Sequence, residues 1–352
     1  NTFSGTFVAM TMHDPLRYSR QIRFPPVGPE GQARLAAGRV AVLGCGAVGG
    51  AAAMPLARAG VGMLRLIDRD LPEASNLPRQ ICFAEADVAE GLPKAVAAAR
   101  HLQRINSALV VEPHVVDLTA ANALELLDGV DVIVDGTDNL EARYLLNEVA
   151  CRLGIPWVHG GAVGSEGRVL TVRPGQTACL RCLVPEPPAA GVLPTCDTAG
   201  IIGPAAMVVG GVQAAEVIKL LLDQTEATAG RMLAFDLWSG QWRSVDLAPL
   251  ATTGCPTCRG QDFPWLEGRL GGGVTPLCGR EAVHVMAASG GSIDLAGLAE
   301  RLAGVAEVSV NRWMLRARVE PGIELSVFAD GRAIVAGTRD EARGRTIVAR
   351  YL

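Results

Sequence analysis

Short apolar runs separated by stretches with helical spacing dominate the larger, N-terminal part of the chain. The runs predict strands and the intervening stretches predict helices, in the order strand, helix, strand. We expect strands at 39–43, 63–67, 109–113, 130–134, 157–159 and 168–172, and helices at 50–59, 120–127 and 205–222. Because parallel strands joined by helices are covered on both faces, this pattern predicts an α/β fold with a Rossmann-like, mostly parallel sheet flanked by helices.

The pattern changes twice towards the C-terminus. Two runs at 233–236 and 241–247 surround a Trp-Ser-Gly turn and predict an antiparallel hairpin. Consecutive glycines and two prolines then predict a linker at 261–276. We therefore divide the chain into a flexible N-terminus at 1–16, a main domain at 17–260, the linker and a small C-terminal α+β module at 277–352. The module is expected to contain strands at 282–286, 316–319, 323–328 and 333–335, helices at 295–302 and 339–350, and a turn at Asp330-Gly331.

The composition narrows the class of protein. The 352 residues are 49% hydrophobic and 19% charged with a formal net charge of −4, which excludes a disordered chain. Lys and Arg form no cluster of the kind that nucleic-acid binding requires. The most apolar stretch, 200–212, is shorter than the ~20 residues of a membrane span, and no secretory signal is visible. We expect a cytoplasmic protein that binds neither nucleic acid nor a membrane.

The cysteines point to a metal. There are nine, and without an export signal a disulfide framework is not expected. Cys179 and Cys182 form one C-x2-C pair, and Cys255 and Cys258 form a second. Two such pairs match a closed tetrahedral site of four thiolates, so we predict a structural zinc site. A redox C-x-x-C beside an incidental pair, or an iron–sulfur cluster, is the alternative.

The glycine-rich segment after the first strand predicts a phosphate-binding turn. Gly44, Gly46 and Gly49 have G-x-G-x-x-G spacing and precede a helix whose N-terminus would face the phosphate. Asp68 ends the second strand and lies 24 residues after Gly44, where a ribose-binding acid is expected. This motif alone leaves a nicotinamide-dependent dehydrogenase open.

Further polar motifs follow in a fixed order: Asp68-Arg69-Asp70, Ser75-Asn76-Leu77-Pro78-Arg79-Gln80, Gly91-Leu92-Pro93-Lys94 and Thr137-Asp138-Asn139. With the opening Arg17-Tyr18-Ser19-Arg20-Gln21 and both cysteine pairs, this series resembles the MoeB/ThiF/HesA group of ubiquitin-activating-enzyme-like adenylyltransferases over about residues 17–260. The resemblance implies an adenylation domain. It would transfer AMP from ATP to the C-terminal Gly-Gly carboxylate of a small β-grasp sulfur carrier protein of the MoaD/ThiS type. Pyrophosphate would leave, and thiocarboxylate formation would follow.

The resemblance also assigns roles to residues. Arg79 and Lys94 would neutralise the triphosphate, Asp138 would hold Mg2+, and Cys196 matches a conjugating or sulfur-transfer cysteine. Arg20 resembles an arginine that reaches the phosphates from a neighbouring subunit, which implies a homodimer. These five are the expected catalytic residues. The residues assigned to ATP binding are Gly44, Gly46, Ala47, Gly49, Asp68, Asp70, Ser75, Asn76, Arg79, Gln80, Lys94, Asp138 and Asn139.

Some of these residues also have a purely structural interpretation. Asn139 could cap the following helix, and Asp70 could only support its loop. His159 is expected to be a packed histidine at a strand end rather than a ligand. A covalent step at Cys196 stays open, because other members with this cysteine only adenylylate their substrates.

The C-terminal module bears on the source of sulfur. Cys278-Gly279-Arg280-Glu281 does not build the loop of the rhodanese domain that many two-domain members carry, so sulfur is expected from a separate donor protein. We expect the module to help dock the carrier or the donor, with a stabilising appendage as the alternative. The carrier could serve molybdopterin, thiamine, cysteine, tRNA thiolation or a secondary metabolite. The alternative function is an NAD(P)-dependent Rossmann oxidoreductase or a non-catalytic nucleotide-binding regulator.

Overall fold

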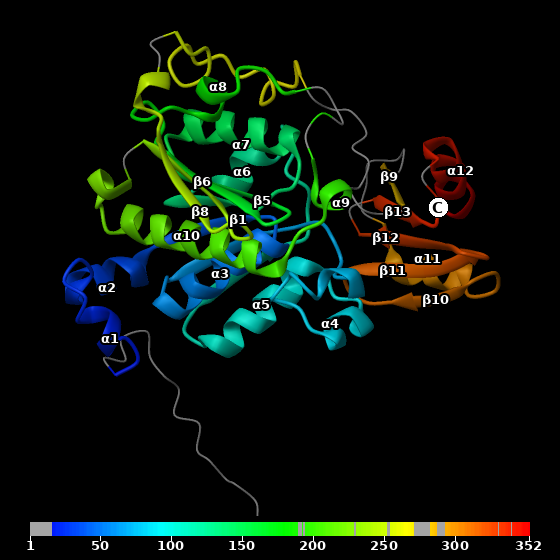
Figure 1. Cartoon of the computed structure of the whole chain (residues 1–352). Coiled ribbons are helices and arrows are strands. Elements are labelled where there is room, and N and C mark those ends of the chain that lie inside the picture. The colour runs from blue at the N-terminus through cyan, green and yellow to red at the C-terminus, as the bar shows by residue number, and fades with distance from the viewer. Residues whose placement is uncertain are drawn as a thin grey trace, which may run out of the picture. The chain divides into compact units, whose positions relative to one another are not determined.

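The chain forms two compact units, Asn1–Gly271 and Gly272–Leu352, each with its own sheet (Figure 1). This computed structural model describes residues 16–188, 192, 194–228, 230–251, 254–270, 282–286, 293–329, 331–338 and 340–352.

An eight-stranded sheet in the order β3-β2-β1-β4-β5-β6-β7-β8 is the centre of the first unit. β3, β2, β1, β4 and β5 pair in parallel, and β6, β7 and β8 continue the sheet antiparallel. The predicted Rossmann-like sheet is confirmed. Because the strand order reverses between β1 and β4, the carboxyl ends of these two strands border the crevice in which such sheets bind ligands. The strands are β1 (Arg39–Leu43), β2 (Met63–Ile67), β3 (Val110–His114), β4 (Val132–Asp135), β5 (Trp157–Val163), β6 (Glu166–Val172), β7 (Arg231–Asp236) and β8 (Gln241–Asp246).

Helices cover both faces of this sheet. They are α1 (Ser19–Ile22), α2 (Gly28–Ala37), α3 (Ala47–Ala59), α4 (Glu85–Glu90), α5 (Lys94–Ile105), α6 (Ala123–Leu127), α7 (Leu140–Leu153), α8 (Leu180–Leu183), α9 (Cys196–Ala199) and α10 (Gly203–Leu221), with short 3-10 turns η1 (Ala74–Asn76), η2 (Thr225–Thr228) and η3 (Ala248–Leu250). On one face α3 and α10 approach closely, because a Cβ at Gly210 would lie only 2.5 Å from the Cβ of Ala51. On the other face α6 and α7 pack over the buried side chains of Ile133 and Trp157.

The helix α10 is long and apolar enough to cross a membrane, judged by length and composition alone. It is longer than the apolar stretch at 200–212 that the sequence suggested as its start. Its buried residues face α3 and the strands β4, β5 and β6. The core helix of a soluble domain has this same character, so the contacts of α10 favour a core role.

The second unit is the small α+β module that the sequence predicted. Its antiparallel sheet has the order β10-β11-β12-β13-β9. The helices α11 and α12 pack on one face of this sheet, with Leu298 of α11 and Ile347 of α12 in the same core cluster as Leu325 of β12. The strands are β9 (Ala282–Met286), β10 (Glu307–Val310), β11 (Met314–Glu320), β12 (Ile323–Phe328) and β13 (Arg332–Ala336), and the helices are α11 (Leu295–Leu302) and α12 (Glu341–Tyr351).

The predicted linker at 261–276 begins too early. Phe263 and Trp265 are buried, and the ring of Trp265 stacks on Tyr144 of α7 at a centroid distance of 4.6 Å. The backbone N–H groups of Trp265 and Leu266 also donate to Glu148 Oε2, both at 2.9 Å. The segment up to residue 270 therefore belongs to the first unit. Residues 271–276, residues 1–15 of the predicted flexible N-terminus at 1–16, Cys278, Asp330 and Arg339 lie outside the described residues.

Candidate active site and metal centre

Glycines close the turn after β1 through backbone contacts. Gly44 has φ +82°, in the left-handed region that favours glycine. A Cβ at Gly49 would lie 1.8 Å from the carbonyl oxygen of Gly44, and one at Gly136 would lie 2.6 Å from the nitrogen of Gly49. At Gly46 a Cβ would meet only the amide of Gln80, 3.6 Å away. The turn is therefore closed on its inner side, while Gly46 leaves room for a phosphate at the start of α3, where Ala47 is the first helical residue.

Asp68 links this turn to the end of β2. Its Oδ2 accepts a hydrogen bond from the backbone N–H of Cys45, and its Oδ1 accepts one from the backbone N–H of Asp70, each at 2.7 Å. Burial raises the pKa of the Asp68 carboxyl, and the positive charge of Lys94 opposes that rise. Each oxygen has a further lone pair, so the carboxylate could accept hydrogen bonds from ribose hydroxyls as well.

Lys94 begins α5 and is held in place by Asp70. The Lys94 Nζ lies 3.4 Å from Asp70 Oδ2, and only 8% of the Lys94 side chain is exposed. The backbone N–H of Lys94 also donates to the carbonyl oxygen of Asp70 at 2.7 Å. These contacts fit the interpretation of Asp70 as a support, and they aim one ammonium group at the Asp68 side of the crevice.

The segment around η1 folds back on itself. Asn76 Oδ1 accepts from the backbone N–H of Glu73 at 3.1 Å, and the Arg79 guanidinium donates to the carbonyl oxygen of Ser75 at 2.7 Å. Gln80 is buried beside Gly46, and its Oε1 has no hydrogen-bond partner among the described residues. A buried acceptor of this kind is a group that a ligand can satisfy.

The loop after β4 carries Asp138 and Asn139. Asp138 is exposed. The side chain of Asn139 accepts from the backbone N–H of Ala142 at 2.8 Å and so caps α7. The predicted capping role of Asn139 is confirmed.

Beneath this loop lies a buried carboxylate, Asp135, to which the sequence analysis gave no role. Its Oδ1 accepts from Thr137 Oγ1 at 2.6 Å, while its Oδ2 lies 2.7 Å from His159 Nδ1 and 3.3 Å from Arg143 Nε. Burial alone would raise the pKa of Asp135, but the charge of Arg143 and the hydrogen bond from His159 outweigh it and lower the pKa. His159 is thus packed on β5 as expected, and its hydrogen-bond partner is the ionised carboxylate of Asp135.

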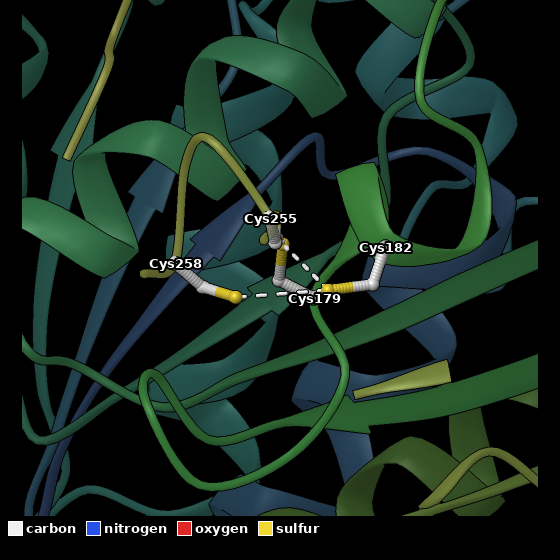
Figure 2. Close-up of side chains that lie close together, drawn as sticks. All are labelled: Cys179, Cys182, Cys255 and Cys258. Carbon is white, nitrogen blue, oxygen red and sulfur yellow. Dashed lines mark hydrogen bonds between the residues drawn. The ribbon is translucent and has the colours of Figure 1, made fainter. Parts of the chain in front are cut away.

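The two cysteine pairs come together, as predicted. The sulfur atoms of Cys179 and Cys182, at α8, point towards those of Cys255 and Cys258, in a distant loop (Figure 2). All four lie within 4.8 Å of one another, with Cys179–Cys255 at 3.7 Å and Cys182–Cys258 at 3.6 Å. Sulfurs bound 2.3 Å from a tetrahedral zinc ion would be about 3.8 Å apart. The cluster could hold zinc.

Cys179 is contacted by two residues of α7, Asn147 and Cys151. The sequence alone did not connect either residue with this cluster. Asn147 is fully buried, its Nδ2 lies 3.7 Å from Cys179 Sγ, and its Oδ1 accepts from the backbone N–H of Leu180 at 3.0 Å. Cys151, one turn later, shares a hydrogen bond with Cys179, which is the largest cause that lowers the pKa of Cys179 to about 4. A thiolate at Cys179 suits a metal ligand. Asn147 and Cys151 are four residues apart on one helix, and this spacing was the sequence signal that could have placed them on the same face.

Arg20 does not reach the crevice within one chain. The helix α1 is anchored by Arg17 to the carbonyl oxygen of Ile105 at 2.6 Å and by Gln21 to that of Ala59 at 2.8 Å. These carbonyls end α5 and α3, at the end of the sheet where the parallel strands begin, whereas the glycine turn follows the carboxyl end of β1. The 13 residues of α3 separate the two places by about 20 Å.

Cys196 opens the short helix α9 and is partly exposed. Its sulfur lies 3.5 Å from the carbonyl oxygen of Ala162 on β5. The thiol is therefore next to the strand that carries His159, which lies three residues before Ala162.

The fold and these contacts define an α/β nucleotide-binding protein with a four-cysteine cluster. The ThiF family model matches residues 18–257, so the chain belongs to the ThiF family.

Two curated relatives and one solved structure illustrate the similarity. The chain is 41% identical over 338 residues to the sulfur carrier protein ThiS adenylyltransferase of Bacillus subtilis, covering 96% of this chain and 99% of the relative. It is 44% identical over 243 residues to the SAMP-activating enzyme E1 of Haloferax volcanii, covering 69% of this chain and 88% of the relative. Escherichia coli MccB, crystallised with ATP, shares the fold with a TM-score of 0.60 at 24% identity, over 69% of this chain and 74% of that one.

Proposed function

We propose that this chain is an ATP-dependent adenylyltransferase that activates the C-terminal Gly-Gly carboxylate of a small sulfur carrier protein. The observation that carries the proposal is the glycine turn, with Asp68, Lys94 and Gln80 around one crevice, in a chain that belongs to the ThiF family. The names of the curated relatives agree with this activity. A dehydrogenase or a non-catalytic regulator is not favoured by them.

The chemistry asks for positioning and charge neutralisation. The carrier carboxylate is already a nucleophile and pyrophosphate is already a fair leaving group, so the transfer needs no general base. In this proposal Gly46 and the start of α3 hold a phosphate, Asp68 binds the ribose, and Lys94 with Arg79 neutralises the triphosphate. Asp138 would hold Mg2+ against the phosphates, because Mg2+ prefers one or two carboxylates together with phosphate oxygens.

The extent of the first relative suggests the type of carrier. That alignment covers 96% of this chain and therefore includes the second unit, whereas the alignment with the SAMP-activating enzyme covers only 69%. The sharing of both units with a ThiS adenylyltransferase favours a ThiS-type carrier. We assign the second unit to docking of the carrier or of a separate sulfur donor protein. Deletion of residues 277–352 should then raise the KM for the carrier, and an unchanged KM would refute this role.

Exchange of labelled pyrophosphate into ATP tests the activity. It should require the ThiS-type carrier with its terminal Gly-Gly and should be lost in Asp138→Ala. Asn122→Ala, which removes only side-chain hydrogen bonds with the backbone of Thr119 and Asp117 at the start of α6, should retain most of it. Absence of carrier-dependent exchange in the wild type would refute the proposal.

The proposal includes a homodimer, and the position of Arg20 supports it. Since α1 is anchored at the end of the sheet opposite the crevice, Arg20 could act only on the crevice of a second copy. Exposed apolar side chains offer a contact surface: Trp242 of the edge strand β8 is 54% exposed beside Phe235, and Met207 of α10 is also exposed. Mixing Arg20→Ala with Asp138→Ala subunits should restore exchange, because one of the two crevices in a mixed dimer is intact. No restoration would exclude action across subunits.

The zinc site and Cys196 complete the proposal. Zinc at the four cysteines would tie α8 to the loop at 255–258. A covalent intermediate at Cys196 is a separate hypothesis that its place next to β5 allows. If Cys196→Ala leaves thiocarboxylate formation with the natural sulfur donor intact, the covalent role is wrong.

A further inference from the structure

His159 and Asp135 form a buried pair that adenylylation does not require. The two residues lie side by side in the register of β4 and β5, and their side chains meet at 2.7 Å through His159 Nδ1. Asp135 is fully buried, while 16% of the His159 side chain remains exposed. The charged groups that act on the ring are Asp135 from β4, Arg143 from α7 and Arg168 from β6.

The pair fixes the tautomer of the imidazole. Because the Asp135 carboxylate can only accept, Nδ1 of His159 must donate and carry a proton. Burial and the charge of Arg143 lower the pKa of His159, although the hydrogen bond to Asp135 opposes this. The ring is therefore neutral near pH 7, with the lone pair on Nε2, which has no hydrogen-bond partner among the described residues.

The lone pair lies beside the crevice. The glycine turn touches the residue after Asp135, since a Cβ at Gly44 would lie 2.8 Å from the carbonyl oxygen of Gly136. β5 is two strands from β1, about 10 Å away. It continues past the end of β4, and Gly161, the next residue on the His159 face, has no side chain to cover Nε2. An acyl group attached to a phosphate at the turn could extend towards this open end of β5.

We propose that His159, oriented by Asp135, is the proton acceptor for a thiol or persulfide S–H group that attacks the carrier acyl-adenylate. This inference rests on the proposed function and concerns the step after adenylylation. The sulfur forms a bond to the carbonyl carbon, the bond from that carbon to the AMP oxygen breaks, and AMP leaves with the bonding electron pair. The S–H proton moves to Nε2, and no atom is oxidised or reduced.

The need for an acceptor depends on the nucleophile. A thiol with a pKa of about 8.5 is only a few per cent thiolate at pH 7, so a positioned base speeds its attack by roughly 10²–10⁴-fold. Inorganic hydrosulfide is already an anion and gains little from a base. Loss of proton acceptance by His159 should therefore slow the thiol but not hydrosulfide. A structural effect of changing the His159–Asp135 pair should slow both nucleophiles.

The test uses the full chain, ATP, a ThiS-type carrier, and either 2-mercaptoethanol or sodium sulfide as the probe. His159→Asn is the informative variant, because its Nδ2 can still donate to Asp135 whereas it has no ring nitrogen to accept a proton. His101→Asn on α5 is the matched control. Single-turnover formation of carrier thioester or thiocarboxylate is followed by intact mass, alongside pyrophosphate exchange.

We expect His159→Asn to slow thioester formation with 2-mercaptoethanol by about 100-fold near pH 7, while sulfide attack and pyrophosphate exchange stay within about threefold of wild type. In the wild type, the thiol reaction should fall below the pKa of His159 and level off above it, whereas attack by free thiolate alone would keep rising up to the pKa of the thiol. A wild-type thiol rate in the variant, or an equal loss with both nucleophiles, would overturn the inference. This wild-type pH profile also tests it if the variant fails to fold. Absence of carrier-dependent pyrophosphate exchange in the wild type would instead refute the proposed function, and the inference with it.

Discussion

The closed inner side of the glycine turn makes Gly49→Ala a severe test of the structure. The added Cβ would lie 1.8 Å from the carbonyl oxygen of Gly44 and 3.1 Å from Val42 Cγ1. Real Cβ atoms do not approach closer than 3.0 Å, so the start of α3 must move by more than 1 Å against a backbone atom. Overpacking of this kind costs about 3 kcal/mol, which corresponds to a fall in Tm of roughly 6–12 °C for a domain of this size.

The matched control is Gly211→Ala on α10, where an added Cβ meets nothing within 4 Å. That variant should keep or slightly raise the Tm, since alanine favours a helix by about 1 kcal/mol over glycine. Thermal unfolding and ATP titration of the three proteins provide the measurements. A Gly49→Ala protein with unchanged Tm and unchanged ATP affinity would show that the turn is not closed as described.

Three further predictions concern the cysteine end of α7 and its pH dependence. Burial raises the pKa of Glu148 to about 7, so its contribution to stability is greatest below its unfolded pKa of 4.5 and is lost as pH rises to 7. Glu148→Gln can still accept hydrogen bonds from the backbone N–H groups of Trp265 and Leu266. Its free energy of unfolding should therefore exceed that of the wild type by about 2–3 kcal/mol at pH 8 but not at pH 4.5. Urea unfolding that gives the same difference between the two proteins at both pH values would contradict this. The proposed zinc site predicts that a strong chelator lowers the Tm of zinc-loaded wild type, and an unchanged Tm after verified zinc loss would argue against a structural metal. Asn147→Ala should lower zinc affinity by about 10–100-fold in a competition titration, whereas Asn139→Ala on the same helix should not.

The sequence predicted most accurately the strands in which nearly every consecutive residue is buried. β1 and β2 have the bounds that their apolar runs predicted, because nearly every residue in them is buried. β10 was missed because three of its four residues are exposed at a sheet edge, so no apolar run marks it. The glycines and prolines after Cys258 were taken for a linker, although Trp265 packs on Tyr144 from a segment without regular structure.

In the site, motifs that are contiguous in sequence were found, and pairings across strands were not. Asp68 and Gly49 belong to one spaced motif. Asp135 and His159 meet only because β4 and β5 align in register, and Cys151 meets Cys179 only because α7 packs against the start of α8. The far position of Arg20 depends on which carbonyls anchor α1, and no local pattern contains that information.

The helix α7 has one practical consequence. Its first turn is capped by Asn139 beside Asp138, and its Asn147 contacts Cys179. The 14-residue helix α7 thus begins at the crevice and ends near the four cysteines. Preparations purified or stored with chelating agents should then lose catalytic competence without any change to the nucleotide-binding residues, and readdition of metal should recover it. Batch-to-batch variation in specific activity should follow bound zinc per chain rather than purity.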